Sequence, residues 1–127
     1  ARKDYHYNET EELFYQLEGE ITIKIQVDGM REDVKMKAGD MYLLPAKIPH
    51  SPGRSAGSVG LVIERVRLGK GFTDGLLWFC DSCNHKLHEA YFELKNIETD
   101  FLNHFNEFYD SEHLRTCKNC GEVLQKP

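Results

Sequence analysis

Residues 13–27, LFYQLEGEITIKIQV, decide the fold class of this 127-residue chain. Isoleucine alternates with polar residues over positions 21–25, and a period of two with β-branched side chains is typical of a half-buried strand. Asp28-Gly29 follows at once, and this dipeptide is a strong signal for a tight hairpin turn. The stretch therefore predicts a β-hairpin whose return strand covers residues 30–36.

The segments that follow the hairpin continue the β pattern. A turn at residues 38–40 precedes MYLLP (41–45), a short apolar strand closed by a proline. Residues 46–60 are rich in Pro, Gly and Ser and are interpreted as a loop, whereas LVIERVRL (61–68) is interpreted as a largely buried strand. Short strands joined by glycine turns favour a barrel or sandwich over an α/β sheet.

The sequence changes character after residue 71. Residues 75–94 are interpreted as a strand, a cysteine knuckle and a second strand, and residues 98–109 carry apolar side chains at helical spacing. We therefore expect a barrel core over 1–71 and a metal-clipped C-terminal extension over 72–127. Both parts fit in one domain, because domains cluster at roughly 100–150 residues.

Charge and composition exclude some partners. The net charge of −5 argues against nucleic acid, because phosphate backbones bind basic surfaces. No run of about 18 apolar residues is present, so no membrane partner is expected. The polar start lacks the apolar region of a secretory signal, which makes the cytoplasm the expected compartment. The first residue is Ala1 rather than Met, as expected if an upstream segment has been removed or left out.

Four cysteines form two C-x-x-C pairs. In a chain without an export signal this pattern indicates a metal clip before it indicates disulfides, which remain the alternative. Four thiolates make a closed tetrahedral site with a structural role, and such a site suits iron and zinc equally. His85 and His88 follow the first pair and are interpreted as structural or exposed residues rather than ligands. The expected ligands are Cys80, Cys83, Cys117 and Cys120.

Two segments carry a second set of metal-binding side chains. They are HYNETEELFYQLEG (6–19) and GDMYLLPAKIPH (39–50), and they resemble the paired motifs of cupin barrels. The first cupin motif supplies a His and a Glu with a glycine seven residues past the Glu, and the second runs Gly-x5-Pro with a His five residues on. The sequence has Lys47 where many cupins have Gly, and it lacks one histidine of the first motif.

The ligands that remain are His6, Glu12 and His50, two imidazoles and one carboxylate. Such a facial set suits Fe(II) and leaves open positions for substrate and O₂. Because imidazole must be neutral to bind a metal, metal loading is expected to weaken at acidic pH. The alternative is that both histidines are ordinary packed or surface residues and that the glutamate is a solvated acid.

Longer stretches allow a more specific comparison. RKDYHYNETEELFYQLEG (2–19), GDMYLLPAKIPHSPGR (39–54) and GLVIERVR (60–67), with the two cysteine pairs, resemble the 3-hydroxyanthranilate 3,4-dioxygenase family over nearly the whole chain. The resemblance implies a mainly β protein: a cupin (double-stranded β-helix or jelly-roll) barrel, one C-terminal helix and a rubredoxin-like metal-clipped tail. It also implies that the N-terminal part of the barrel lies upstream of this sequence.

The same resemblance implies an activity. An Fe(II) enzyme of this family opens the ring of 3-hydroxyanthranilate with O₂ to give 2-amino-3-carboxymuconate semialdehyde, on the kynurenine route from tryptophan to quinolinate and NAD. It further implies a homodimer and a second iron or zinc at the four cysteines. Two alternatives stay open: a non-enzymatic metal-binding cupin module with a zinc-ribbon tail, and a cupin dioxygenase for another aminophenol or catechol.

Matching the family motifs also assigns substrate residues. Arg54 is implied to hold the ring carboxylate, which a guanidinium binds through two parallel hydrogen bonds, unless it is a loop arginine in solvent. Glu64, mid-strand in an apolar run, is implied to accept a proton from the substrate, unless it pairs with Arg65, Arg67 or another cation of the protein. Arg2 is implied to face the O₂ side, and Pro52 and Phe14 either line the pocket or pack as ordinary barrel residues.

Overall fold

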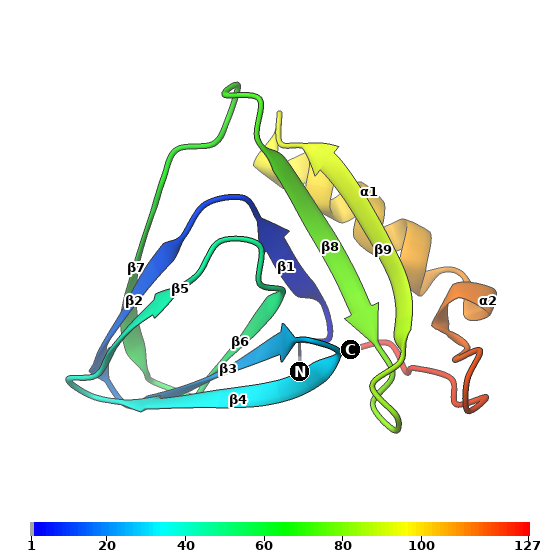
Figure 1. Cartoon of the computed structure of the whole chain (residues 1–127), viewed down its shortest axis with the longest axis horizontal. Helices are drawn as coiled ribbons and strands as arrows, with labels where there is room; N and C mark the ends of the chain where they lie inside the picture. Colours follow the sequence, from blue (N-terminus) through cyan, green and yellow to red (C-terminus); the bar gives the residue numbers. More distant parts are fainter. Residues whose placement is uncertain (1) are drawn as a thin grey trace.

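The structure is a computed structural model that describes residues 2–127. Within these residues, nine strands form two antiparallel sheets, and two helices follow them in the sequence (Figure 1). The elements are β1 (Tyr5–Asn8), β2 (Glu12–Glu18), β3 (Glu20–Val27), β4 (Met30–Lys37), β5 (Met41–Leu44), β6 (His50–Arg54), β7 (Val59–Glu64), β8 (Thr73–Phe79), β9 (Lys86–Glu93), α1 (Ile97–Tyr109) and α2 (Glu112–Arg115).

The predicted hairpin is strands β3 and β4. They pair antiparallel without a break from Glu20↔Lys37 to Val27↔Met30. Asp28 and Gly29 both have positive φ angles, 51° and 77°, as the two central residues of a type I′ turn require. The alternating isoleucines of β3 point into the core, which confirms the interpretation of this stretch as a half-buried strand.

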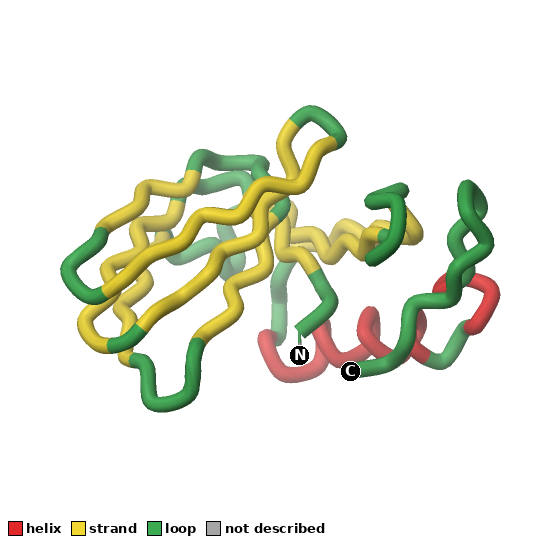
Figure 2. The backbone as a smooth tube through the Cα atoms, turned by 90° about the horizontal axis from the view of Figure 1, so that it is seen from below, coloured by secondary structure: helices red, strands yellow, loops and turns green. Residues whose placement is uncertain are grey.

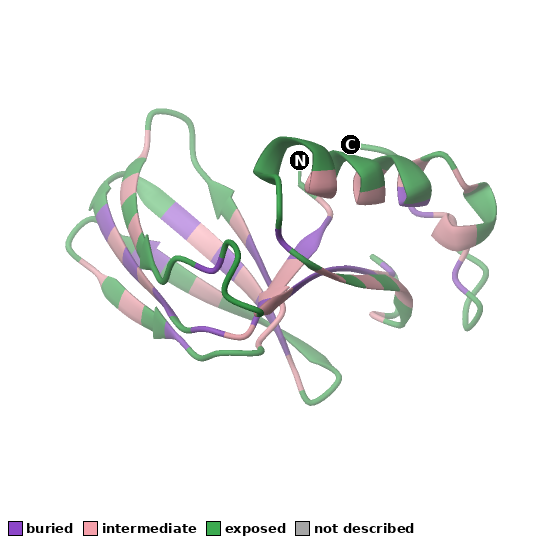
Figure 3. Cartoon of the chain, turned by 90° about the horizontal axis from the view of Figure 1, so that it is seen from above, coloured by how far each residue is buried: buried purple, intermediate pink, exposed green. Residues whose placement is uncertain are grey.

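The two sheets enclose one hydrophobic core. The larger sheet has the order β4-β3-β6-β1-β8-β9 and the smaller one β5-β2-β7. Buried side chains from both sheets pack against one another between them. Figure 3 marks the buried positions in purple along the strands. This arrangement confirms the mainly β cupin class. The core residues are Phe14, Ile21, Ile23, Ile25, Met36 and Leu44.

The predicted loop over residues 46–60 is wrong in its middle. Strand β6 forms there and pairs with β3 along its whole length, including Ile23↔Pro52. The Gln26 N–H donates to the Pro49 carbonyl, which makes Ile23↔Pro52 a pair without mutual hydrogen bonds. On its other side β6 pairs with β1 only at His50. Proline is tolerated in this strand because its missing N–H has no partner to meet.

The predicted buried strand over residues 61–68 is also partly wrong. Strand β7 ends at Glu64, and Leu61 and Ile63 are 48% and 55% exposed. Only Val62 between them packs against the core. The strand lies at the edge of the smaller sheet with one face outward. An unbroken apolar run is typical of a strand buried on both faces, but only one face of β7 is buried.

The C-terminal part extends the larger sheet. Strand β8 pairs with all of β1, and β9 pairs with β8. Helix α1 packs on this end of the sheet, where Trp78 and Phe108 stack with ring centroids 4.3 Å apart. Figure 2 shows both helices beside this half of the chain, away from the β3–β4 hairpin.

The helix prediction is confirmed in α1, which begins after the N-cap Asn96. One further helix, α2, was not predicted, because a single four-residue turn shows no periodicity. No helix within residues 2–127 has the length and apolarity needed to cross a membrane. The division of the chain at residue 71 within one domain stays a prediction.

Candidate active site

Three predicted ligands lie together between the two sheets. His6 on β1, Glu12 on β2 and His50 on β6 each direct a ligand atom to one point, with these atoms within 4.8 Å of one another. Glu12 and His50 are each 3% exposed. A cavity of about 230 Å³ opens at this point. Its lining residues are Arg2, His6, Glu12, Phe14, His50, Pro52, Arg54, Val62 and Glu64, which include every residue expected to bind the catalytic metal or the substrate.

Strand register explains why these side chains meet. His6 pairs directly with His50 across β1 and β6, and their rings lie 5.3 Å apart. Glu12 pairs directly with Glu64 across β2 and β7. Directly paired residues share one face of a sheet. Each sheet therefore presents one cross-strand pair to the cavity between them.

Outer hydrogen bonds orient both imidazoles. His50 Nδ1 lies 2.9 Å from the Ile48 carbonyl oxygen, which can only accept, so Nδ1 carries the proton and Nε2 is free to bind a metal. That Nε2 lies 3.4 Å from Glu12 Oε1. His6 Nε2 lies 2.7 Å from Asp74 Oδ2, which leaves the other ring nitrogen for a metal.

Glu12 is held as a carboxylate. Burial raises the pKa of Glu12, but the hydrogen bond and charge of His50, the charge of His6 and the hydrogen bond from Asn8 together place it below its usual value. Asn8 Nδ2 donates to Glu12 Oε1 at 2.5 Å, while its Oδ1 accepts from the backbone N–H of Thr10. Two imidazoles and one carboxylate around a buried point are a donor set that suits a divalent metal such as Fe(II).

Arg54 has room in the cavity because its neighbour is glycine. A Cβ on Gly60 of β7 would overlap Arg54 Nη1 and approach Gln16 Oε1 to 2.8 Å. Gly60 does not have a positive φ angle, so the backbone conformation does not require glycine at this position. The absence of a side chain matters because it leaves space for the Arg54 guanidinium.

Glu64 and Arg2 each form an ion pair with another residue of this chain. Glu64 is the last residue of β7 rather than a mid-strand residue, and its side chain is 40% exposed. Its Oε1 accepts from Arg67 Nη1 at 3.0 Å, so it lines the cavity while making one of the ion pairs considered above. Arg2 forms an ion pair of 2.8 Å with Asp4 and also lines the cavity.

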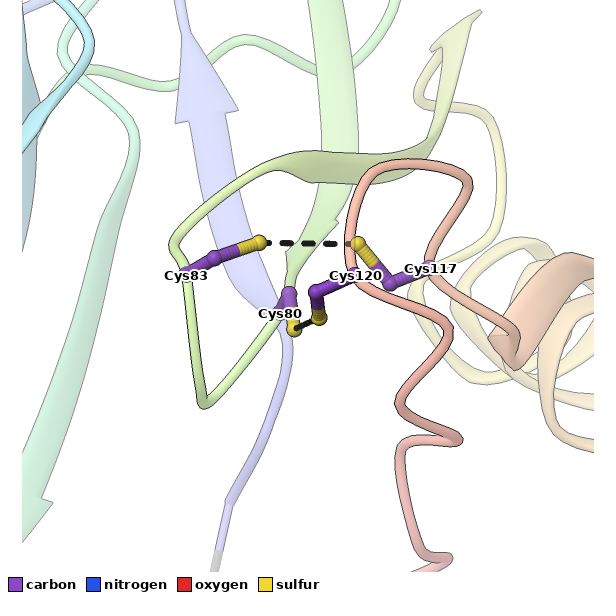
Figure 4. Close-up of side chains that lie close together, drawn as sticks. All are labelled: Cys80, Cys83, Cys117 and Cys120. Carbon is purple, nitrogen blue, oxygen red and sulfur yellow. Dashed lines mark hydrogen bonds between the residues drawn. The ribbon is translucent and has the colours of Figure 1, made fainter.

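The four cysteines form a second cluster (Figure 4). Cys80 Sγ lies 3.6 Å from Cys120 Sγ, and Cys83 Sγ lies 3.6 Å from Cys117 Sγ. A disulfide requires about 2.05 Å, whereas a tetrahedral ion with metal–sulfur bonds of about 2.3 Å places the sulfurs roughly 3.8 Å apart. All four are free thiols with the spacing of a metal site.

The two knuckles have the same backbone geometry. Asn84 N–H donates to the Cys80 carbonyl and Gly121 N–H donates to the Cys117 carbonyl, and both residues have positive φ angles. Asn and Gly are the residues that adopt this conformation at least cost. The sequence difference between the knuckles therefore leaves their shape the same.

The four thiols differ in how readily they ionise. The Asn119 amide donates to Cys83 Sγ and, with the His85 backbone, lowers the pKa of Cys83 to about 6. The backbone at Glu122 lowers the pKa of Cys120, but the neighbouring cysteines and desolvation raise it to about 12. These opposite shifts mean that four thiolates would not form together readily, and a bound metal ion would supply the charge that stabilises them.

Comparison with known proteins decides the family. The family described as "3-hydroxyanthranilic acid dioxygenase" matches residues 1–109. The chain is 57% identical over 127 residues to the 3-hydroxyanthranilate 3,4-dioxygenase of Xanthomonas oryzae pv. oryzae (strain MAFF 311018), with 100% of this chain and 72% of the relative covered. Its counterpart in Bacillus thuringiensis (strain Al Hakam) is 42% identical over 124 residues, with 97% and 69% covered.

This chain belongs to the 3-hydroxyanthranilic acid dioxygenase family. It is therefore a dioxygenase, an oxidoreductase that uses O₂ and an aromatic substrate, and membership of the family implies a metal cofactor. The non-enzymatic alternative is set aside.

Several residues around the site of this dioxygenase were not identified from the sequence. Asn8 carried a usable signal, because Asn-x-Thr favours an Asx turn. Gly60 gave none, since it fell at the end of a presumed loop. Asp74 reaches the site from a segment distant from the cupin motifs, and only strand pairing brings it to His6. Arg67 was predicted only as a possible cation for Glu64, and its bonds to Asp74 were not predicted.

Proposed function

We propose that this chain, with Fe(II) at His6, Glu12 and His50, converts 3-hydroxyanthranilate and O₂ to 2-amino-3-carboxymuconate semialdehyde. The observation that carries the proposal is the convergence of these three side chains on one buried cavity that Arg54 and Glu64 also line. The substrate is taken from the names of the two relatives. Bound iron would supply coordination sites at which the ring's oxygen and nitrogen and O₂ meet.

The chain's own residues would bind and orient the ring. The Arg54 guanidinium, held at the cavity by the space at Gly60, would pair with the substrate carboxylate. Glu64 would accept a proton from the hydroxyl or amine, and its hydrogen bond from Arg67 fixes the direction of its carboxylate. Phe14 and Pro52 would form the apolar wall beside the ring, and Arg2 would face the O₂ side.

The decisive measurement is O₂ uptake. We expect protein reconstituted anaerobically with Fe(II) to consume about one O₂ per 3-hydroxyanthranilate and to form the product's absorbance band at the same rate. Metal-free protein is the control. Uptake with a catechol or another aminophenol, but none with 3-hydroxyanthranilate, would favour the second alternative and reject the proposed substrate.

Replacement of Arg54 by Ala is expected to impair substrate binding and leave the metal in place. Loss of a bidentate charged contact costs about 1.5–3 kcal/mol, which corresponds to an increase in KM of roughly 10–100-fold. The measurements are steady-state KM and bound iron. Arg31→Ala is the matched control, because Arg31 is an exposed arginine on β4 whose partner is Asp33. An unchanged KM in R54A would contradict the role given to Arg54.

Gly60→Ala tests the same contact without removing a charge. The new methyl group is expected to push the Arg54 guanidinium out of its position and raise KM by roughly tenfold or more, since small misplacements in a site are costly. Gly57→Ala is unsuitable as a control because Gly57 has a positive φ angle, so Gly53→Ala serves, where a Cβ meets only the Thr22 carbonyl at 3.5 Å. A normal KM in G60A would show that Arg54 does not need this space.

Further properties are proposed from the cysteine spacing and from the family resemblance. A structural iron or zinc at the four cysteines is supported by their spacing. A homodimer, a cytoplasmic location and a place on the kynurenine route to NAD rest on the family resemblance. Sedimentation of the reconstituted protein would test the dimer, with a monomer mass as the contradicting result.

A further inference from the structure

A buried carboxylate outside the cupin motifs contacts the metal site. Asp74 on β8 is 0% exposed, and its Oδ2 lies 2.7 Å from His6 Nε2. Burial raises the pKa of Asp74, but hydrogen bonds from His6 and Arg67 outweigh this and keep it below its usual value. An acid that is fully removed from solvent is costly unless its partners are well placed.

Strand register places this carboxylate. His6 pairs with Leu76 and Asn8 pairs with Asp74 across β1 and β8. Asp74 is therefore the diagonal neighbour of His6 on the same face of the sheet, a position within reach of a side-chain hydrogen bond. Asn8, directly opposite Asp74, is the residue that donates to Glu12.

Arg67 fixes Asp74 and connects it to the other side of the cavity. The guanidinium donates through Nε to Asp74 Oδ1 and through Nη2 to Asp74 Oδ2, both at 2.9 Å. Its Nη1 donates to Glu64 Oε1 at 3.0 Å. Arg67 is 6% exposed and Asp74 0%, so the two bonds between them are shielded from solvent, whereas the bond to Glu64 reaches a side chain that is 40% exposed. A planar guanidinium is the side chain that can make such a fork, whereas lysine offers only a point charge.

We propose that Asp74 is a positioning residue for His6, and that Arg67 holds Asp74 and Glu64 in one rigid unit, so that the orientation of a metal ligand and of a substrate-facing acid are set together. The inference rests on the proposed function. The ion pair between Glu64 and Arg67 then has a role in the site. The guanidinium that bonds one oxygen of Glu64 also holds the Asp74 carboxylate that contacts His6. Outer-shell carboxylates of this kind orient a ligating imidazole and raise its basicity.

Asp74→Asn is the first test. The amide keeps the shape of the carboxylate but removes its charge, and we expect Fe(II) affinity at the histidine site to fall about 10–100-fold in anaerobic titrations. Zinc loaded beforehand at the four cysteines is the internal control, and its content is expected to stay unchanged. Leu124→Ala is the control for a general loss of stability. It removes a buried side chain of the C-terminal core that does not line the metal site. It should retain the wild-type Fe(II) affinity.

Arg67→Lys covers the case in which D74N does not fold. Lysine keeps a positive charge beside Asp74 but cannot make the three bonds, so we expect weaker Fe(II) affinity, by about tenfold, together with a raised substrate KM. An affinity within twofold of wild type in folded D74N, or in folded R67K if D74N is unfolded, overturns the inference. If wild-type protein binds no Fe(II) at all, the proposed function fails instead, so the two failures are distinguishable.

Discussion

His50→Ala is expected to abolish both metal binding at the histidine site and turnover, because it removes one of the three proposed ligands. His50 is buried, directly paired with His6, and its tautomer is set by the Ile48 carbonyl, so no nearby side chain takes its place. We expect the loss in affinity to exceed the roughly 10–100-fold that removal of an outer hydrogen-bond partner costs. Metal analysis after anaerobic reconstitution and O₂ uptake with 3-hydroxyanthranilate measure the two effects.

The four-cysteine site and a surface histidine provide the controls for this variant. Metal at the cysteines should be unchanged in H50A, which separates a local defect from unfolding. His113 is exposed on α2, and His113→Ala is expected to keep full iron content and turnover. If H50A retained turnover, the assignment of the metal ligands would have to be abandoned.

Cys117→Ser is expected to cause the largest loss of stability. Cys117 is 2% exposed and faces Cys83 from the far end of the sequence, so the cluster ties the C-terminal segment to the knuckle after β8. Structural metal sites contribute folding free energy directly. We expect the melting temperature to fall by on the order of 10 °C, as a loss of a few kcal/mol produces in a domain of this size. Circular dichroism melts and zinc release to a chromogenic chelator measure this.

The loss is also expected to reach the active site. The first knuckle follows β8, and β8 carries Asp74 and pairs with β1, which carries His6. Ser82→Ala is the matched control, because Ser82 contacts Cys80 Sγ through its backbone N–H, which alanine retains. A C117S protein with wild-type melting temperature and metal content would show that the cysteines are not a structural metal site.

Local patterns predicted the fold well where apolar and polar residues alternate along a strand. The isoleucine alternation of β3 and the Asp-Gly turn after it fixed a hairpin correctly, because both depend only on neighbouring residues. The same reasoning failed at β6 and β7. Whether a proline fits a strand depends on which partner strand needs its N–H, and whether an apolar run is buried depends on what covers its second face.

The sequence alone predicted the two proposed ligand sets of this dioxygenase, because His6, Glu12, His50 and the two C-x-x-C pairs lie in local motifs with the spacing of metal ligands. Tertiary structure alone decided which side chains support those ligands. Asp74 lies 68 positions from His6 and carries no motif, and it reaches the imidazole only because the β1–β8 register makes the two diagonal neighbours. Gly60 matters to Arg54 for the same reason, since the space it leaves exists only when β7 faces β6 across the cavity. Register depends on the packing of the whole sheet, and no short stretch of sequence contains it.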